Sequence, residues 1–370
     1  MVKILHIVSS WGVGGVESYI FNFAKHIKKY EFDILTLRKT ENKTIFNLSG
    51  TSQIYNLSKV EGNYFKRTKK RKDEIIEFIL KHKYEVVHID TTTADMLIIA
   101  KEIKKRTNVK IIYHSHATDV EAPNVFLKRV LHYYSKRLYY SNVDYYIAAS
   151  KDAAIWMYPK KILKNNCHII TCGADLEKFR FNYDDRIDIR NKFNLEKKIV
   201  IGTVGRFSNQ KNIPFIINLI ELMAKKKIDF NFLWIGNGHL FEDTKEEVKK
   251  RKLDKYVIFT GNIKEVEKLY SAMDIFILPS FYEANPIVAI EAQANGLKCI
   301  LSDTITKESN VSNTVSYISC KNIDLWMAEI LKNREYVRKD NIEIIIKRGA
   351  SVKENSIKLL EIYDKVFMEE

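Results

Sequence analysis

Two glutamates stand eight positions apart in residues 279–296, which read PSFYEANPIVAIEAQANG. Glu283 precedes a predicted helix, and the first backbone N–H groups of a helix point outward and can bind an anion. Glu291 lies inside that helix, which is expected to be buried because it is apolar on nearly all sides. A buried carboxylate is costly without hydrogen-bond donors, and no Lys or Arg lies within one turn of Glu291. Its donors must come from another segment, such as a distant Arg, or from the hydroxyl groups of a ligand.

Two cations flank a polar turn in residues 205–212, GRFSNQKN. Gly205 opens this turn directly after a predicted strand, and Arg206 and Lys211 stand just before a predicted helix. Fixed cations at a helix N-terminus are suited to a diphosphate group. The turn is therefore a candidate phosphate site.

Three further turns allow a ligand to approach the backbone closely. Gly14 and Gly15 lie in SWGVGGVE between a predicted strand and a predicted helix, where N–H groups can reach a phosphate. This turn does not match GxGxxG, so a dinucleotide site is a poor fit, and an ordinary glycine turn remains the alternative. Gly236 opens a Gly-Asn-Gly turn, and Asn262 closes a Phe-Thr-Gly-Asn turn whose exposed main chain could contact a planar base.

A cluster of polar residues follows another predicted strand in residues 113–119, YHSHATD. A single histidine in such a place is often structural. Here two histidines, a serine and an aspartate stand together beyond one strand, which favours a site with His116 pointing into it.

A framework of alternating strands and helices must position these side chains. Apolar, β-rich runs predict strands at 4–9, 32–37, 53–57, 86–89, 110–114, 145–149, 199–204, 231–235, 257–260, 275–278 and 299–302. Helices fit between them, for example over 17–29 and 73–82. Such alternation predicts an α/β protein with two Rossmann-like, doubly wound domains, linked near residues 173–182. Where two such domains face each other, ligands bind in the cleft between them, at the carboxyl ends of the strands.

The composition is that of a globular protein of about two domains. The chain has 370 residues, of which 46% are hydrophobic and 29% charged. No apolar run reaches the roughly 18–20 residues of a membrane-spanning helix. The first residues, MVKILHIVSS, have an apolar core too short for a secretion signal and predict a strand. The four cysteines lack CxxC spacing and suggest reduced thiols in a cytosolic protein.

The positive charge is concentrated in the first half of the chain. The net charge is +15, and residues 1–175 carry +12 of it. This excess suggests an anionic partner, such as a membrane surface, nucleic acid or an acidic substrate, although many lysines merely solvate a surface.

Residues 124–140 predict a helix with two distinct faces. The expected core face consists of Leu127, Val130, Leu131, Tyr134 and Leu138. The other flank is basic and aromatic and consists of Phe126, Arg129, Tyr133, Lys136, Arg137 and Tyr140. That flank could rest on an anionic bilayer, and a surface helix with snorkelling cations is the alternative.

Taken together, these motifs resemble the large retaining glycosyltransferase family 4, which has the GT-B fold. The resemblance rests on GGVE near the start, GRFSNQKN, GNG, FTGN and the E-x7-E pair, and it extends to about Asp303. Residues 281–309, FYEANPIVAIEAQANGLKCILSDTITKES, are similar to the branch that builds bacterial capsular polysaccharides and exopolysaccharides.

The resemblance implies a role for each candidate side chain. Arg206 and Lys211 would bind the donor diphosphate and stabilise it as it leaves. Glu283 would bind hydroxyl groups of the donor sugar, and Glu291 would bind those of the ribose. His116 would contact the transferred sugar near the reacting centre.

Main-chain groups would complete the implied donor site. Gly14 and Gly15 would approach the phosphates, and the backbone of Asn285, Pro286 and Ile287 would hold sugar or phosphate. The turns at Gly205, Gly236 and Asn262 would lie against the nucleotide. Two residues depart from the family pattern: Ala284 stands where many relatives have Gly, and Cys172 begins an interdomain segment where Asn-Gly is common. The first departure leaves the identity of the donor sugar open.

The resemblance also implies the domain boundaries, the substrates and the cellular location. Residues 1–177 would bind the acceptor and residues 178–350 the donor, while 351–370 would form a helix returning to the first domain. The donor would be a UDP-sugar, with no metal and no other cofactor, and the chain lacks the Asp-x-Asp metal motif of the other glycosyltransferase fold. The enzyme would work in the cytoplasm at the inner membrane face, where its basic domain meets a saccharide or polyprenyl-diphosphate-linked acceptor.

Two other functions remain open from the sequence. A UDP-sugar epimerase would share the fold and act without an acceptor, whereas a phosphorylase would need a pyridoxal-binding lysine and usually a longer chain. A binding module for an anionic surface is supported only by charge, and no recognised nucleic-acid module is present.

Overall fold

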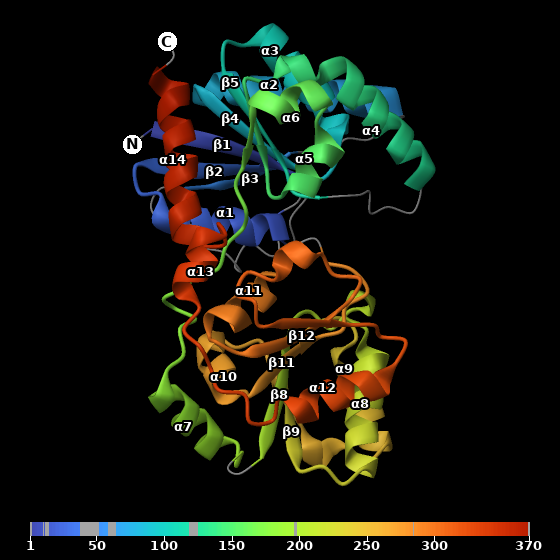
Figure 1. Ribbon diagram of the computed structural model, residues 1–370. Helices are drawn as coiled ribbons and strands as arrows, with labels where there is room; N and C mark the ends of the chain where they lie inside the picture. Colours follow the sequence, from blue (N-terminus) through green and yellow to red (C-terminus); the bar gives the residue numbers. More distant parts are fainter. Residues whose placement is uncertain are drawn as a thin grey trace. The chain divides into compact units, whose positions relative to one another are not determined.

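The structure is a computed structural model that describes residues 2–9, 11, 15–37, 52–57, 64–117, 125–195, 198–283 and 285–368. The chain forms two compact units (Figure 1). The first comprises Met1–Cys172 and Val352–Glu370, and the second comprises Gly173–Ser351, so residues 173–177 group with the second unit. Helix α14 (Val352–Met368) groups with the first unit. Within the described ranges, no helix is long and apolar enough to cross a bilayer.

A parallel sheet of seven strands forms the centre of the first unit, in the order β3-β2-β1-β4-β5-β6-β7. The strands are β1 (Val2–Val8), β2 (Tyr30–Thr36), β3 (Ile54–Asn56), β4 (Val86–Thr91), β5 (Lys110–Ser115), β6 (Tyr145–Ala148) and β7 (Cys167–Ile169). All except β7 were predicted. Strand β7 has only three residues, at the edge of the sheet, and carries no apolar run for a pattern to detect.

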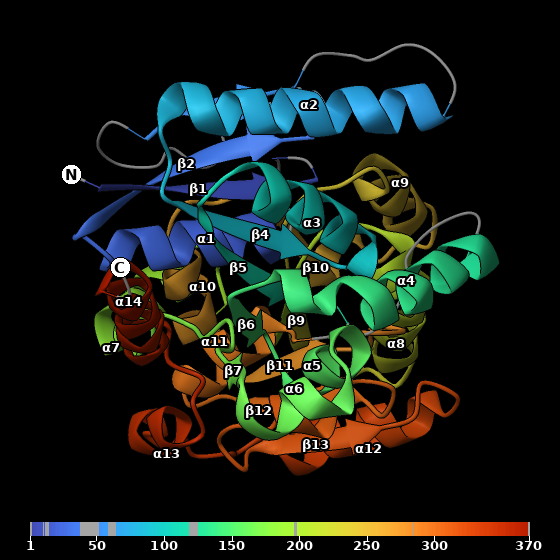
Figure 2. The same cartoon turned by 90° about the horizontal axis from the view of Figure 1, so that it is seen from above.

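Helices cover both faces of this sheet (Figures 1 and 2). They are α1 (Gly15–His26), α2 (Tyr64–His82), α3 (Leu97–Arg106), α4 (Val125–Tyr139), α5 (Lys151–Met157), α6 (Lys160–Asn165) and α14. Helix α1 packs against α14, and α2 packs against α3. Side chains of a strand alternate between the two faces. In β1, Leu5 and Ile7 join the core that includes α2 and α3, whereas His6 faces Tyr363 of α14.

A parallel sheet of six strands forms the centre of the second unit, in the order β10-β9-β8-β11-β12-β13. The strands are β8 (Ile199–Val204), β9 (Phe230–Ile235), β10 (Val257–Gly261), β11 (Ile275–Leu278), β12 (Lys298–Ser302) and β13 (Val315–Ile318). The sequence predicted all but the edge strand β13, which is only half-buried. The two parallel sheets confirm the predicted α/β class.

The helices of the second unit include the apolar one predicted around Glu291. They are α7 (Tyr183–Lys192), α8 (Ile213–Lys225), α9 (Phe241–Lys250), α10 (Val266–Ala272), α11 (Ile287–Ala294), α12 (Ile323–Lys332) and α13 (Ile342–Lys347). Helix α11 packs on β11 and β12 and buries most of its residues, as predicted. Pro286 is its N-cap residue, and Gly296 follows its end with a φ of +77°, a conformation that favours glycine.

The orientation of α4 differs from the prediction. Three residues expected in the core are exposed, namely Val130, Tyr134 and Leu138. The side chain of Leu127 lies outside the described residues. The buried face instead carries the polar residues Ser135 and His132, and His132 accepts a hydrogen bond from the main chain of Ala94. The prediction failed because apolar spacing alone does not distinguish a core face from an exposed apolar face.

Candidate active site

The candidate site of the second unit lies where its sheet changes direction. The chain runs outward from β8 through β9 to β10, and then returns to place β11 on the other side of β8. In open parallel sheets of this kind, ligands bind at the carboxyl ends of the strands beside this switch point. The loops that follow β8 and β11 therefore meet where a ligand is expected.

Glycines make the turn after β8 compact. A Cβ atom on Gly236 would lie 2.0 Å from the carbonyl oxygen of Gly205, and the φ of Gly236 is +128°. A Cβ atom on Gly205 would in turn lie 2.7 Å from Cε of Lys211. Both predicted turn glycines thus allow backbone segments and the Lys211 side chain to pack together closely.

Lys211 and Glu283 form an ion pair at the switch point. Nζ of Lys211 lies 2.6 Å from Oε1 of Glu283, and both side chains are largely buried, with exposed fractions of 16% and 11%. The loops that carry them are also bonded directly, because the N–H of Phe281 donates to the carbonyl of Gln210 at 2.9 Å. The structure therefore brings together a cation and a carboxylate that lie in separate motifs of the sequence.

Arg206 stands beside this pair in the chain but differs from Lys211 in its surroundings. Arg206 is exposed, and no described residue forms a hydrogen bond or ion pair with its guanidinium group. Asn262, at the end of β10, is also exposed. These two side chains can therefore bind a ligand without first breaking a contact to the described part of the chain.

Glu291 is partly buried and is bonded to a tyrosine. The hydroxyl group of Tyr270, on α10, donates to Oε2 of Glu291 at 2.8 Å. Burial raises the pKa of Glu291 to about 7, against the opposing effect of this hydrogen bond. The donor thus comes from another segment, as one sequence alternative required, but it is a tyrosine rather than an arginine. A carboxylate can accept about four hydrogen bonds, so it retains capacity for hydroxyl groups of a ligand.

The start of α11 lies between the two glutamates. Asn285 is half-buried, Pro286 is buried, and the helix begins at Ile287. The first N–H groups of a helix have no intrahelical acceptor, so this end can receive an anion or a hydroxyl group. Ala284 lies outside the described residues.

His116 belongs to the first unit and follows β5. Its N–H donates to the carbonyl of Thr91 at 2.9 Å, and its Nε2 lies 2.8 Å from Oδ1 of Asp90. Gly15 is the first residue of α1, and Gly14 lies outside the described residues. The partner Asp90 was not predicted, although a charged residue within the apolar run of β4 was a visible signal.

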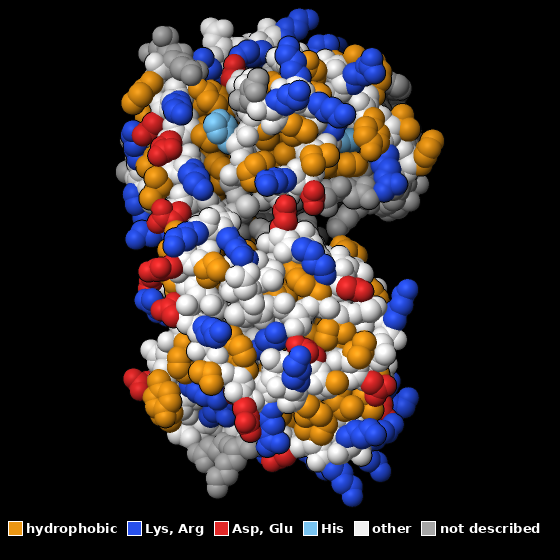
Figure 3. Space-filling view, in the orientation of Figure 1, with side chains coloured by type: hydrophobic (Ala, Val, Ile, Leu, Met, Phe, Trp, Pro, Cys, Tyr) orange, Lys and Arg blue, Asp and Glu red, His pale blue; other side chains and the backbone are white. Residues whose placement is uncertain are grey.

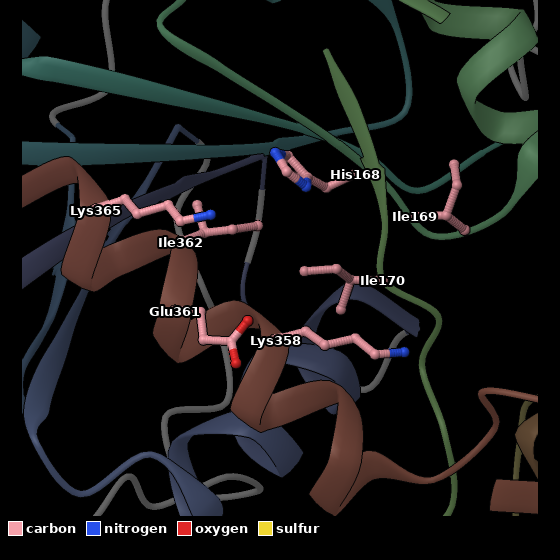
Figure 4. A pocket seen from close by; sticks show the side chains of 7 residues that line it. All are labelled: His168, Ile169, Ile170, Lys358, Glu361, Ile362 and Lys365. Atoms are coloured by element: carbon pink, nitrogen blue, oxygen red, sulfur yellow. The ribbon is translucent and has the colours of Figure 1, made fainter. Parts of the chain in front are cut away.

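The first unit also has a hollow of about 150 Å³ between β7 and α14 (Figure 4). Lys358, Glu361 and Lys365 project from α14, opposite His168 of β7, and all four residues are exposed. Burial and the nearby charge of Lys365 lower the pKa of His168. None of the predicted site residues lines this hollow, so it is separate from the candidate site.

Both halves of the chain match known families. Residues 13–178 match Glycosyltransferase Family 4, and residues 185–356 match Glycosyl transferases group 1. The chain belongs to glycosyltransferase family 4. The predicted enzyme class, a retaining glycosyltransferase, is thereby confirmed. The fold of this glycosyltransferase is similar to that of sucrose-phosphate synthase from Thermosynechococcus elongatus, with a TM-score of 0.77, 18% identity and full coverage of both chains, which confirms the predicted GT-B fold.

Two bacterial proteins are similar in sequence to this glycosyltransferase. The putative glycosyltransferase EpsF of Bacillus subtilis is 26% identical over 98% of this chain and 96% of its own length. The UDP-Gal:alpha-D-GlcNAc-diphosphoundecaprenol alpha-1,3-galactosyltransferase of Escherichia coli is 26% identical over 62% of this chain and 60% of its own length.

The raised pKa of Glu291 predicts a pH-dependent stability that Glu291→Gln removes. Because this pKa is about 7 in the folded protein and has an ordinary value of 4.5, the folded form retains a proton that the unfolded chain loses. The contribution of Glu291 to wild-type stability should therefore fall as pH rises from 4.5 to 7, by at most about 3 kcal/mol. Urea unfolding of wild type and Glu291→Gln between pH 4.5 and 8 measures the difference.

The matched control is Glu242→Gln, which changes an exposed glutamate of α9 in the same unit. Its stability should follow the wild-type pH dependence. If Glu291→Gln and wild type also gave parallel curves, Glu291 would not titrate in this range.

Proposed function

We propose that this glycosyltransferase transfers a sugar from a UDP-sugar, with retained configuration, to a hydroxyl group of a lipid-linked saccharide in capsular or exopolysaccharide synthesis. The observation that carries the proposal is the Lys211–Glu283 ion pair beside the exposed Arg206. Nζ of Lys211 and Oε1 of Glu283 lie 2.6 Å apart at the switch point, and the proposal assigns Lys211 to the phosphate and Glu283 to the sugar hydroxyls. The relative from Escherichia coli supports it, because its name specifies a UDP-sugar and a diphosphoundecaprenol-linked acceptor.

In this proposal, the diphosphate lies against the turn after β8. Arg206 donates its exposed N–H groups to the phosphate oxygens, and Lys211 adds a second positive charge. Gly205 and Gly236 let this turn and the Lys211 side chain pack closely together there. Bond cleavage leaves negative charge on the departing UDP, and fixed cations stabilise such developing charge.

The carboxylates bind hydroxyl groups in the same proposal. Glu283 uses Oε1 for Lys211, which leaves Oε2 to accept from a hydroxyl of the donor sugar. Glu291 accepts from the ribose, and these new donors favour its ionised form. Tyr270 holds Glu291 in place from the protein side.

The remaining predicted residues complete the proposed donor site. The main chain at Asn285, Pro286 and Ile287 holds sugar or phosphate, and the turn at Asn262 lies against the uracil. From the first unit, Gly14 and Gly15 approach the phosphates, and His116 contacts the transferred sugar. In the proposed transfer, the acceptor oxygen bonds to the anomeric carbon as the bond from that carbon to the phosphate oxygen breaks, and the acceptor proton goes to the leaving phosphate.

A lipid-linked acceptor lies in a membrane, so the proposal includes binding of the enzyme to the inner face of the cell membrane. The surface of α4 supports this location. Its exposed apolar side chains are Phe126, Val130, Tyr133, Tyr134 and Leu138. Basic residues of the same helix include Lys128, Arg129 and Arg137. Figure 3 shows basic and hydrophobic side chains interspersed over the first unit. Such a mixture suits the boundary between anionic headgroups and acyl chains.

Replacing either phosphate-binding cation should impair turnover more than nucleotide binding. We expect Arg206→Ala and Lys211→Ala to lower kcat by about 100-fold or more, since they remove transition-state charge stabilisation. UDP affinity should fall by only about tenfold. After a thermal-shift screen has identified the preferred UDP-sugar, UDP release in the presence of a polyprenyl-diphosphate saccharide gives kcat, and calorimetry gives Kd for UDP.

Lys225→Ala is the matched control, because Lys225 is exposed and pairs with Glu221 in the same unit. It should keep kcat within about twofold of wild type. Full turnover by Arg206→Ala and Lys211→Ala would refute the role given to these cations.

The membrane proposal predicts loss of vesicle binding on removal of exposed apolar groups from α4. Phe126 and Tyr133 have exposed fractions of 82% and 57%, so Phe126→Ser with Tyr133→Ser should not change stability. Binding to vesicles containing phosphatidylglycerol should weaken by about tenfold, as measured by co-sedimentation. Phe281→Ser, at an exposed position of the second unit, is the control. Unchanged vesicle binding by the double variant would exclude α4 as the membrane contact.

A further inference from the structure

The first unit buries a cluster of polar side chains under α1 and α14, which we call the histidine cluster. Its members are His6, His88, Asp90, His114, His116 and Tyr363. His6 stands beside His88 in the register of β1 and β4, and Asp90 stands beside His114 in the register of β4 and β5. Tyr19 of α1 packs edge-on against the rings of His114 and His116. A polar cluster this deep needs a hydrogen-bond partner for nearly every group.

Asp90 accepts a hydrogen bond through each of its carboxylate oxygens. His6 Nδ1 lies 2.7 Å from Oδ2, and His116 Nε2 lies 2.8 Å from Oδ1. Burial alone would raise the pKa of Asp90, but His88, His6 and His116 together hold this pKa well below its usual range. An ionised carboxylate only accepts hydrogen bonds, so both histidines must be the donors. His116 therefore carries a proton on Nε2.

The other bonds of the cluster follow the same direction. In the Nδ1–H tautomer of His6, Nε2 accepts from the hydroxyl of Tyr363, 3.4 Å away. Tyr363 in turn accepts from His88 Nδ1 at 2.8 Å, and His88 Nε2 accepts from His114 Nδ1 at 3.1 Å. This assignment requires neutral rings for His88 and His114. Burial lowers the pKa of His88 to about 3 and lowers that of His114 well below its usual value, so both are neutral.

The geometry favours hydrogen bonds over a metal site. Two overlapping sets of ligand atoms each lie within 4.8 Å of one another, which would allow a cation: those of His6, His88 and Asp90, and those of Asp90, His114 and His116. However, both histidine pairs are stacked: the ring centroids are 4.5 Å apart for His6 and His88 and 4.1 Å apart for His114 and His116, with planes at 23° and 26°. Stacked rings do not direct their nitrogens towards one ion, whereas each hydrogen bond within the cluster, at 2.7–3.4 Å, pairs a donor with an acceptor.

We propose that Asp90 is a positioning residue that fixes His116 in the Nε2–H tautomer and presents its Nδ1 lone pair to a hydroxyl of the transferred sugar. This inference rests on the proposed contact between His116 and that sugar. His6 and Tyr363 hold Asp90 from the other side, so α14 helps to orient the ring. The proposal gives a chemical reason for a buried carboxylate among the histidines of this sheet face.

Asp90→Asn tests the proposal in the full-length protein. An amide retains the size of the carboxylate but has one donor and one acceptor end, so it no longer requires donors from both histidines. We expect kcat to fall by about tenfold or more, with KM for the donor within about threefold of wild type. The control is Asp33→Asn, the same change at a buried carboxylate of β2 that accepts from Tyr84 and lies outside the cluster. It should retain both kcat and KM.

The tautomer is measured separately by long-range ¹H–¹⁵N NMR of histidine-labelled protein, at a pH where the ring is neutral. The signal of His116 is identified by its loss in His116→Gln. Wild type and Asp33→Asn should show the Nε2–H form, and Asp90→Asn should show a shifted or mixed form. This measurement does not depend on knowing the sugar, so it separates failure of the inference from failure of the proposed function.

Several results would overturn the inference. They are an Nδ1–H tautomer of His116 in wild type, equal loss of kcat in Asp33→Asn and Asp90→Asn, or unchanged kcat and tautomer in Asp90→Asn. Stoichiometric metal in the purified protein would also overturn it, because the cluster would then be a coordination site. If Asp90→Asn does not fold, the tautomer of His116 in wild type alone still decides whether the inference holds.

Discussion

The ion pair between Lys211 and Glu283 is the constraint around which the second unit is arranged. A cation and a carboxylate from different motifs meet at 2.6 Å only because β8 and β11 are neighbours in the sheet and both loops leave its carboxyl edge. The pair keeps Lys211 in place and satisfies its charge in a largely buried setting, where an unpaired ammonium group would be costly. A donor that brings phosphate to one partner and hydroxyls to the other can use both without moving either.

The first unit also buries a carboxylate, that of Asp90, and satisfies it with hydrogen bonds from histidines. His6, Asp90 and His116 come from β1, β4 and the end of β5, and they form one chain of donors and acceptors around a single carboxylate. Tyr363 continues that chain into α14, so the last helix contributes a polar contact as well as apolar packing. A rigid network of this kind suits a histidine that must hold one orientation.

The sequence predicted the features that local rules determine and missed those that depend on distant partners. Glycines and cations within a few residues of strand ends identified the turns at Gly205 and Gly236, because strand, turn and helix are consecutive there. The Tyr270 donor to Glu291 and the Tyr363 contact with His88 were missed, since their partners lie 21 and 275 residues away. The sequence assigned the wrong face of α4 to the core, because the polar face, which includes His132, is the buried one.

A crystal structure of the glycosyltransferase with bound UDP tests the central claim most directly. The account predicts diphosphate oxygens within hydrogen-bond distance of Arg206 and Lys211, and ribose hydroxyls bonded to Glu291. UDP bound away from the carboxyl edge of the second sheet, or bound there with Glu291 turned away from the ribose, would contradict it.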